Sequence, residues 1–110
     1  MTTRDVRNAA ERILAEMGGN AEEICNGDCP VFAMKLVDAV GGQIVSNLQN
    51  AMVDDLEGYE VIAPDERWPN PNRSFHMSHC WVKVGKMYYD AFNPEGVDNE
   101  HLLEFYQNNA

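Results

Sequence analysis

The stretch SHCWVKVGKMYYDAF, residues 78–92, decides which fold this chain can adopt. Apolar and polar residues alternate on both sides of Gly85 and Lys86, which predicts two short strands joined by a two-residue turn. The strands are expected over about residues 76–84 and 87–92. A turn of this length pairs Val84 with Met87, Lys83 with Tyr88, Trp81 with Asp90 and His79 with Phe92.

His79 and Asp90 lie on the same face of the predicted hairpin. They are diagonal neighbours, and the Cβ atoms of such pairs are about 5–8 Å apart. One hydrogen bond between the side chains spans that distance, so the carboxylate can orient the imidazole. A different turn length would shift the register, and a slip of one residue would place the two side chains on opposite faces.

The rest of the chain predicts two helices, then short strands and a proline-rich surface loop. Apolar residues recur at helical spacing in residues 3–17, and Gly18 and Gly19 end this helix. The loop covers residues 64–74. The other expected elements are a helix over 30–40 that ends at Gly41, strands over 43–45 and 59–63, a weak helix over 48–56, a turn at NPEG, and a last helix over 98–106.

Length and composition limit the fold class. A chain of 110 residues with 45% hydrophobic residues can build one compact core, so we expect a single domain over residues 1–110. The order of the elements predicts an α+β fold in which the N-terminal helices pack on a small antiparallel sheet.

The chain is strongly acidic, with 18 acidic against 8 basic residues and a formal net charge of -10. A surface of this sign repels phosphate backbones, which argues against direct binding of nucleic acid. An electrostatic partner is expected to be a basic protein surface, for instance a groove that normally holds nucleic acid. The alternative is that the acidic residues only keep a small protein in solution.

The N-terminal residues contain no apolar signal segment, and no apolar run approaches the length of a membrane span. The three cysteines, Cys25, Cys29 and Cys80, cannot all pair within one chain, which fits a reducing compartment. These observations predict a cytoplasmic protein with no membrane partner.

Cys29 is the candidate nucleophile, because NGDCPVFAMKL places it at the start of the second helix. The helix N-terminus favours a thiolate, and its backbone N–H groups can hold an oxyanion. A cysteine nucleophile needs a base, and the base needs an orienting group. The chain offers Cys29, His79 and Asp90 in that order.

The segments GDCPVFA and HCWVKVGKMYYDAFNPEG resemble the papain-like cysteine peptidases in their transglutaminase-like branch. The resemblance covers residues 27–33 and 78–96, about a quarter of the chain. It implies a minimal papain-like domain in which Cys29 is the nucleophile, His79 the general base and acid, and Asp90 the orienting residue. The implied chemistry is acyl transfer through a thioester: amide hydrolysis, deamidation or transamidation.

The chain departs from this family at the oxyanion hole. Papain-like enzymes usually place a glutamine several residues before the cysteine, and here Asn26 is the residue that could substitute for it. Asp28, beside the cysteine, opposes the helix dipole. Whether the chain is an enzyme is therefore left open.

A zinc site is an alternative use of the same residues, with ligands drawn from Cys25, Cys29, His76, His79 and Cys80. The spacing does not match a zinc knuckle, and neighbouring residues of a strand, such as His79 and Cys80, point to opposite faces. We expect no metal and no cofactor, and we expect Cys80 to be a buried, apolar-like residue.

By size and acidity the chain is similar to the small anti-CRISPR proteins that bacteriophages encode. This resemblance implies a phage or mobile-element protein of the bacterial cytosol that binds and inhibits a basic host protein. The alternative function is a stand-alone cysteine hydrolase, amidase or acyltransferase that acts on a protein or peptide. The residues expected at the binding surface are Trp81, Asp54, Asp55, Glu57, Asp65 and Glu66.

Overall fold

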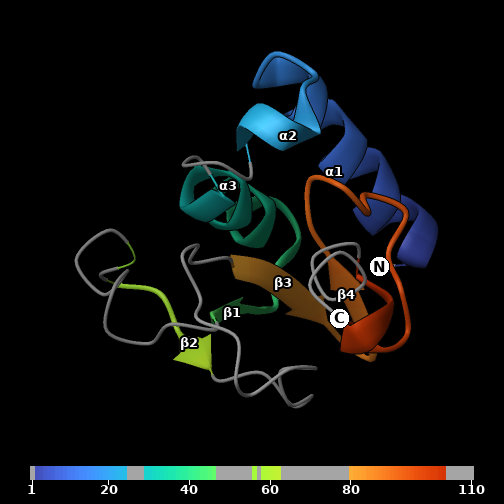
Figure 1. Cartoon of the computed structure of the whole chain (residues 1–110). Coiled ribbons are helices and arrows are strands. Elements are labelled where there is room, and N and C mark those ends of the chain that lie inside the picture. The colour runs from blue at the N-terminus through green and yellow to red at the C-terminus, as the bar shows by residue number, and fades with distance from the viewer. Residues whose placement is uncertain (1, 25–28, 47–55, 57, 63–79, 104–110) are drawn as a thin grey trace, which may run out of the picture.

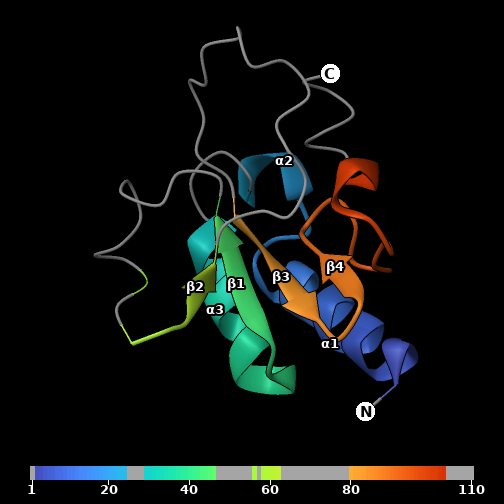
Figure 2. The same ribbon diagram turned by 90° about the horizontal axis from the view of Figure 1, so that it is seen from below.

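In the part of the chain that is described, two helices cover one face of a four-stranded sheet (Figures 1 and 2). The computed structural model describes residues 2–24, 29–46, 56, 58–62 and 80–103. The elements are α1 (Thr3–Glu16), α2 (Ala21–Glu23), α3 (Cys29–Val40), β1 (Gln43–Ser46), β2 (Val61–Ile62), β3 (Cys80–Val84), β4 (Met87–Tyr89) and the 3-10 turn η2 (Glu100–Leu102). The α+β class is therefore confirmed.

Local sequence signals set the ends of the two long helices. At the start of α1, the Thr2 hydroxyl accepts the Asp5 N–H at 3.2 Å and the Asp5 carboxylate accepts the Thr2 N–H at 3.0 Å. Hydrogen bonds from the Thr2 backbone and the Thr2 side chain lower the pKa of Asp5, and the bond from the backbone has the larger effect. At the end of α3, the Gly41 N–H donates to the Val37 carbonyl at 2.8 Å. The helices predicted over residues 3–17 and 30–40 are therefore confirmed.

The strand order is β2-β1-β3-β4, with β2 and β4 at the two edges. β3 runs antiparallel to both β1 and β4, whereas β2 runs parallel to β1. The expectation of an antiparallel sheet is therefore wrong at β2. Parallel neighbours need a crossover connection of about a dozen residues or more, and residues 47–60 separate these two strands.

The predicted hairpin forms in the expected register as far as the pair of Val82 with Tyr89, and the expected pair of Trp81 with Asp90 is not part of it. Val84 pairs with Met87 and Lys83 with Tyr88, so the turn contains Gly85 and Lys86. The second strand is shorter than expected, because β4 ends at Tyr89. The chain then turns, and the Asn93 N–H donates to the Asp90 carboxylate at 2.8 Å and faces the Asp90 carbonyl at 3.2 Å.

The C-terminal helix also differs from expectation over the residues described. The Leu102 N–H donates to Asn99 and the Leu103 N–H to Glu100, each at 3.0 Å, and bonds of this spacing define a 3-10 turn. Residues 104–106, the rest of the expected helix, lie outside the described part, as does nearly all of the expected helix over 48–56.

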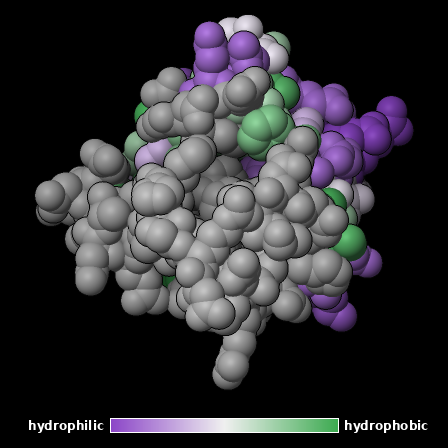
Figure 3. Space-filling model, in the orientation of Figure 1, coloured by the Kyte–Doolittle hydropathy of each residue, from purple (hydrophilic) through white to green (hydrophobic). Residues whose placement is uncertain are grey.

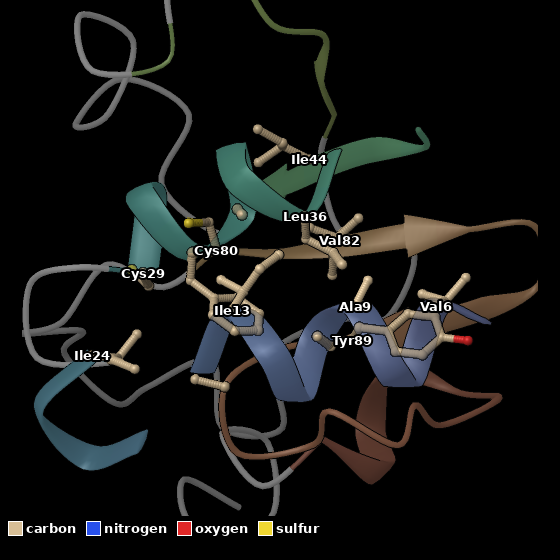
Figure 4. Close-up of a cluster of buried hydrophobic side chains, with 14 of the residues drawn as sticks. Val6, Ala9, Ile13, Ile24, Cys29, Leu36, Ile44, Cys80, Val82 and Tyr89 are labelled. Atoms are coloured by element: carbon tan, nitrogen blue, oxygen red, sulfur yellow. The ribbon is translucent and has the colours of Figure 1, made fainter. Parts of the chain in front are cut away.

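The sheet buries side chains on both faces, because successive residues of a strand point to opposite sides. The helix-covered face contributes Ile44, Cys80, Val82 and Tyr89, which pack with Val6, Ala10 and Ile13 of α1 and with Phe32 and Leu36 of α3 (Figure 4). The other face carries a second cluster of Val45, Trp81, Tyr88 and Leu103. Among the described residues, no helix combines the length and the apolar character needed to cross a lipid bilayer.

Gly96 of the predicted NPEG turn packs directly against Tyr89. Its φ is 83°, and a Cβ atom built there would lie 2.5 Å from the Tyr89 ring. Tyr89 is only 1% exposed and has little room to move, and burial raises the pKa of its hydroxyl.

Gly96→Ala is expected to lower the free energy of unfolding by about 2–4 kcal/mol, because it combines left-handed backbone strain with overpacking. Gly18→Ala is the matched control, since φ is 102° there and no described atom lies within 4 Å of the added Cβ. It should cost about 1–2 kcal/mol from strain. Equal losses of unfolding free energy for the two variants, measured by urea denaturation, would show that the contact between residue 96 and Tyr89 does not require a glycine.

Candidate functional site

Cys29 is the first residue of α3, as the sequence predicts. Its side chain is 4% exposed and belongs to the cluster between the helices and the sheet (Figure 4). Phe32, Ala33 and Leu36 are buried on the same helix, so packing holds α3 in place behind the cysteine. The thiol therefore combines the positive end of a helix dipole with very little access to solvent.

Cys80 opens β3 and faces the same cluster, with 2% of its surface exposed. β1 places Ser46, which is 0% exposed, directly opposite it. In Figure 4, Cys80 at the start of β3 lies near the first turn of α3, and α3 and β3 are in contact. The expectation that Cys80 is a buried core residue is confirmed.

Asp90 follows β4 and is 1% exposed. Its carboxylate accepts the Asn93 N–H at 2.8 Å, which holds one oxygen toward the turn that ends the hairpin. A buried carboxylate needs such hydrogen bonds to offset its desolvation. The structure therefore gives Asp90 a fixed position at the end of β4, as an orienting residue requires.

The aromatic residues Trp81 and Tyr88 of the hairpin lie in the core. Trp81 is completely buried and Tyr88 is 8% exposed, and both pack with Val45 and Leu103. The Lys83 amino group lies 5.8 Å from the centre of the Tyr88 ring, close enough for a cation–π contact. A role for Trp81 in binding stays a prediction.

Several predicted site residues lie outside the described part of the chain: His79, Asn26, Asp54, Asp55, Glu57, Asp65 and Glu66. The convergence of Cys29, His79 and Asp90 therefore stays a prediction. The structure does place Cys80, which follows His79 at the start of β3, and the two other members of the predicted triad, Cys29 and Asp90.

Sequence reasoning missed two buried polar residues. Glu100 is 1% exposed in η2, and nothing in its sequence neighbourhood distinguishes it from the exposed acidic residues. Ser46 is 0% exposed at the end of β1. Extending the alternation of β1 by one residue beyond Val45 would have placed Ser46 on the buried face shared by Ile44.

The described side chains do not support a metal centre. Within the described ranges, no three His, Cys, Asp or Glu side chains gather closely enough to hold a metal ion. Cys25, His76 and His79 lie outside those ranges, so the zinc alternative is not tested.

Comparison with protein-family models, with curated proteins and with solved structures gives no match to this chain. The resemblance to papain-like peptidases therefore rests on the segments around Cys29 and on the hairpin.

If Cys29 is an activated nucleophile, iodoacetamide should label it at least tenfold faster than Cys80 in the folded protein. Their burial is nearly the same, so exposure cannot produce such a difference, whereas the helix N-terminus and a paired histidine would. Mass spectrometry of peptides after brief labelling measures both rates.

His79→Ala should remove the advantage of Cys29 without changing the labelling rate of Cys80, because the base activates only the thiol that it faces. Equal labelling of the two thiols in the wild-type protein would mean that Cys29 is a core residue without catalytic activation.

Proposed function

We propose that this protein binds a basic surface of a host protein through a continuous acidic region. The observation that carries the proposal is the distribution of charge along residues 36–66. This stretch contains seven carboxylates and no lysine or arginine: Asp38, Asp54, Asp55, Glu57, Glu60, Asp65 and Glu66.

Two of these carboxylates, Asp38 and Glu60, lie in the described part of the chain, and hydrogen bonds tie Asp38 to the segment that leads into β2 and Glu60, within that segment, to β1. The Tyr59 hydroxyl lies 3.0 Å from both carboxylate oxygens of Asp38 on α3, and it donates its proton to that carboxylate. This bond raises the pKa of the Tyr59 hydroxyl. From β1, the Gln43 amide donates to the Glu60 carboxylate at 2.9 Å. Asp38 and Glu60 are exposed, so their charges face solvent.

Within the described ranges, no cationic side chain lies on β2 or in residues 36–62. Arg4, Arg7 and Arg12 belong to α1, Lys35 to α3, and Lys83 and Lys86 to the β3–β4 hairpin. β4 is the edge strand opposite β2. The excess of carboxylates in residues 36–66 would attract a basic partner during encounter.

A protein groove that normally holds nucleic acid has the required charge and concave shape. The channel of a CRISPR effector complex is the concrete candidate, because the chain is similar in size and acidity to phage anti-CRISPR proteins. In this proposal the protein occupies the channel in place of a phosphate backbone, and inhibition follows from competition with nucleic acid.

A cysteine hydrolase or acyltransferase is the second candidate. The position of Cys29 as the first residue of α3 favours it, together with the buried Asp90 after β4. The 4% exposure of Cys29 weighs against it, because an acyl substrate must reach the sulfur. For this reason binding ranks above catalysis.

The two candidates predict opposite effects of two variants in a DNA-displacement assay on a guide-RNA-loaded CRISPR effector complex. Reversal of Asp54, Asp55 and Glu57 to lysine should weaken displacement at least tenfold, because it replaces three attractive charges by three repulsive ones. Cys29→Ala should leave displacement unchanged if it stays folded by circular dichroism. Displacement by the wild-type protein should also weaken as salt rises.

The matched control reverses Glu11, Glu16 and Glu23 to lysine, which changes the net charge equally outside residues 36–66. This control should retain most of the displacement. Loss of inhibition by a folded Cys29→Ala protein that still binds the complex would instead make the thiol the basis of function. Equal losses in the two charge variants would mean that only net charge matters.

A further inference from the structure

A pocket of about 310 Å³ lies between the first two turns of α1 and the hairpin side of the sheet. Among the described residues, its lining consists of Thr3, Arg4, Arg7, Met87 and Glu95. The pocket therefore joins three segments that are distant in sequence: α1, β4 and the turn after Asp90. Figure 2 shows the end of the β3–β4 hairpin beside α1.

The two arginines of this pocket are available for a ligand. Both side chains are exposed, and they are three residues apart, so they project from neighbouring positions on one side of α1. The nearest acidic residue in sequence, Asp5, has its carboxylate engaged by the Thr2 N–H at 3.0 Å. The ion pair found within the described ranges joins Arg12 to Glu16, one to two turns further along α1. Figure 3 shows the hydrophilic margin that the exposed side of α1 forms.

The pocket has the opposite sign to the molecule as a whole. Two guanidinium groups and one carboxylate give the lining a net positive charge, whereas the whole chain carries -10. The side-chain amide of Asn93 donates a hydrogen bond to the Glu95 carboxylate at 3.3 Å, which restricts the motion of the Glu95 side chain. A negatively charged ligand would therefore be attracted here by local contacts, against the field of the rest of the protein.

We propose that this pocket binds the phosphate group of a small phosphorylated ligand. Guanidinium groups present planar pairs of N–H donors that match phosphate oxygens, and two of them balance the charge of a phosphate dianion. The volume exceeds that of phosphate itself, so the remainder of the ligand would lie over Thr3 and Met87. This site uses residues other than those of the acidic region, because none of its described lining residues lies within residues 36–66.

The test is a titration of the full chain with inorganic phosphate, followed by NMR at constant ionic strength. Saturable amide shifts are expected at Thr3, Arg4, Arg7 and the turn at Glu95. Arg4→Gln and Arg7→Gln should each weaken binding at least tenfold, because each removes charge-assisted hydrogen bonds. Both residues are exposed, so the variants should fold normally.

Two further variants distinguish this pocket from general attraction to α1. Arg12→Gln removes an equal charge outside the pocket and should leave the affinity unchanged. Glu95→Gln should tighten phosphate binding several-fold, because it removes the one negative charge of the lining. The proposal is overturned if no saturable shifts occur, if Arg12→Gln weakens binding as much as Arg7→Gln, or if Glu95→Gln has no effect.

Discussion

The packing of α3 on β3 and β1 is the constraint on which the other features depend. Leu36 from the helix and Ile44 and Val82 from the strands have no exposed surface, so this layer closes without water. Burial of such side chains contributes about 1.5–3 kcal/mol each relative to exposure, a large share of the stability of a small domain. Cys29 is the first residue of this helix, so the same packing fixes the distance between Cys29 and the sheet.

Local signals in the sequence were sufficient for the elements whose partners are close in the chain. The hairpin register followed from a two-residue turn at Gly85, and the start of α3 followed from the proline after Cys29. The parallel pairing of β2 was not predictable in this way, because Val61 carries no local sign of the strand it joins. That pairing depends on a crossover of residues 47–60, whose closure is decided by the tertiary fold.

The candidate site shows the same division between local and long-range information. The sequence placed Cys29 correctly at a helix N-terminus, but it placed Asp90 within the second strand of the hairpin, whereas β4 ends one residue earlier, at Tyr89. It could not show that the thiol would be 4% exposed, since exposure depends on how α1 covers α3. Nor could it bring Arg4 and Glu95 to one pocket, because no periodic pattern connects an N-terminal helix with a turn some ninety residues later.

The isolated pairing of Tyr88 with Val97 has a consequence for the behaviour of the protein in concentrated solution. The Tyr88 N–H donates to Val97 at 2.8 Å, and the Val97 N–H donates back at 2.9 Å, so the outer side of β4 is already hydrogen-bonded at its centre. Exposed strand edges are the usual templates for cross-molecular sheet growth. The chain thus shields this edge with its own backbone, which protects a newly folded copy from amyloid-like assembly through β4.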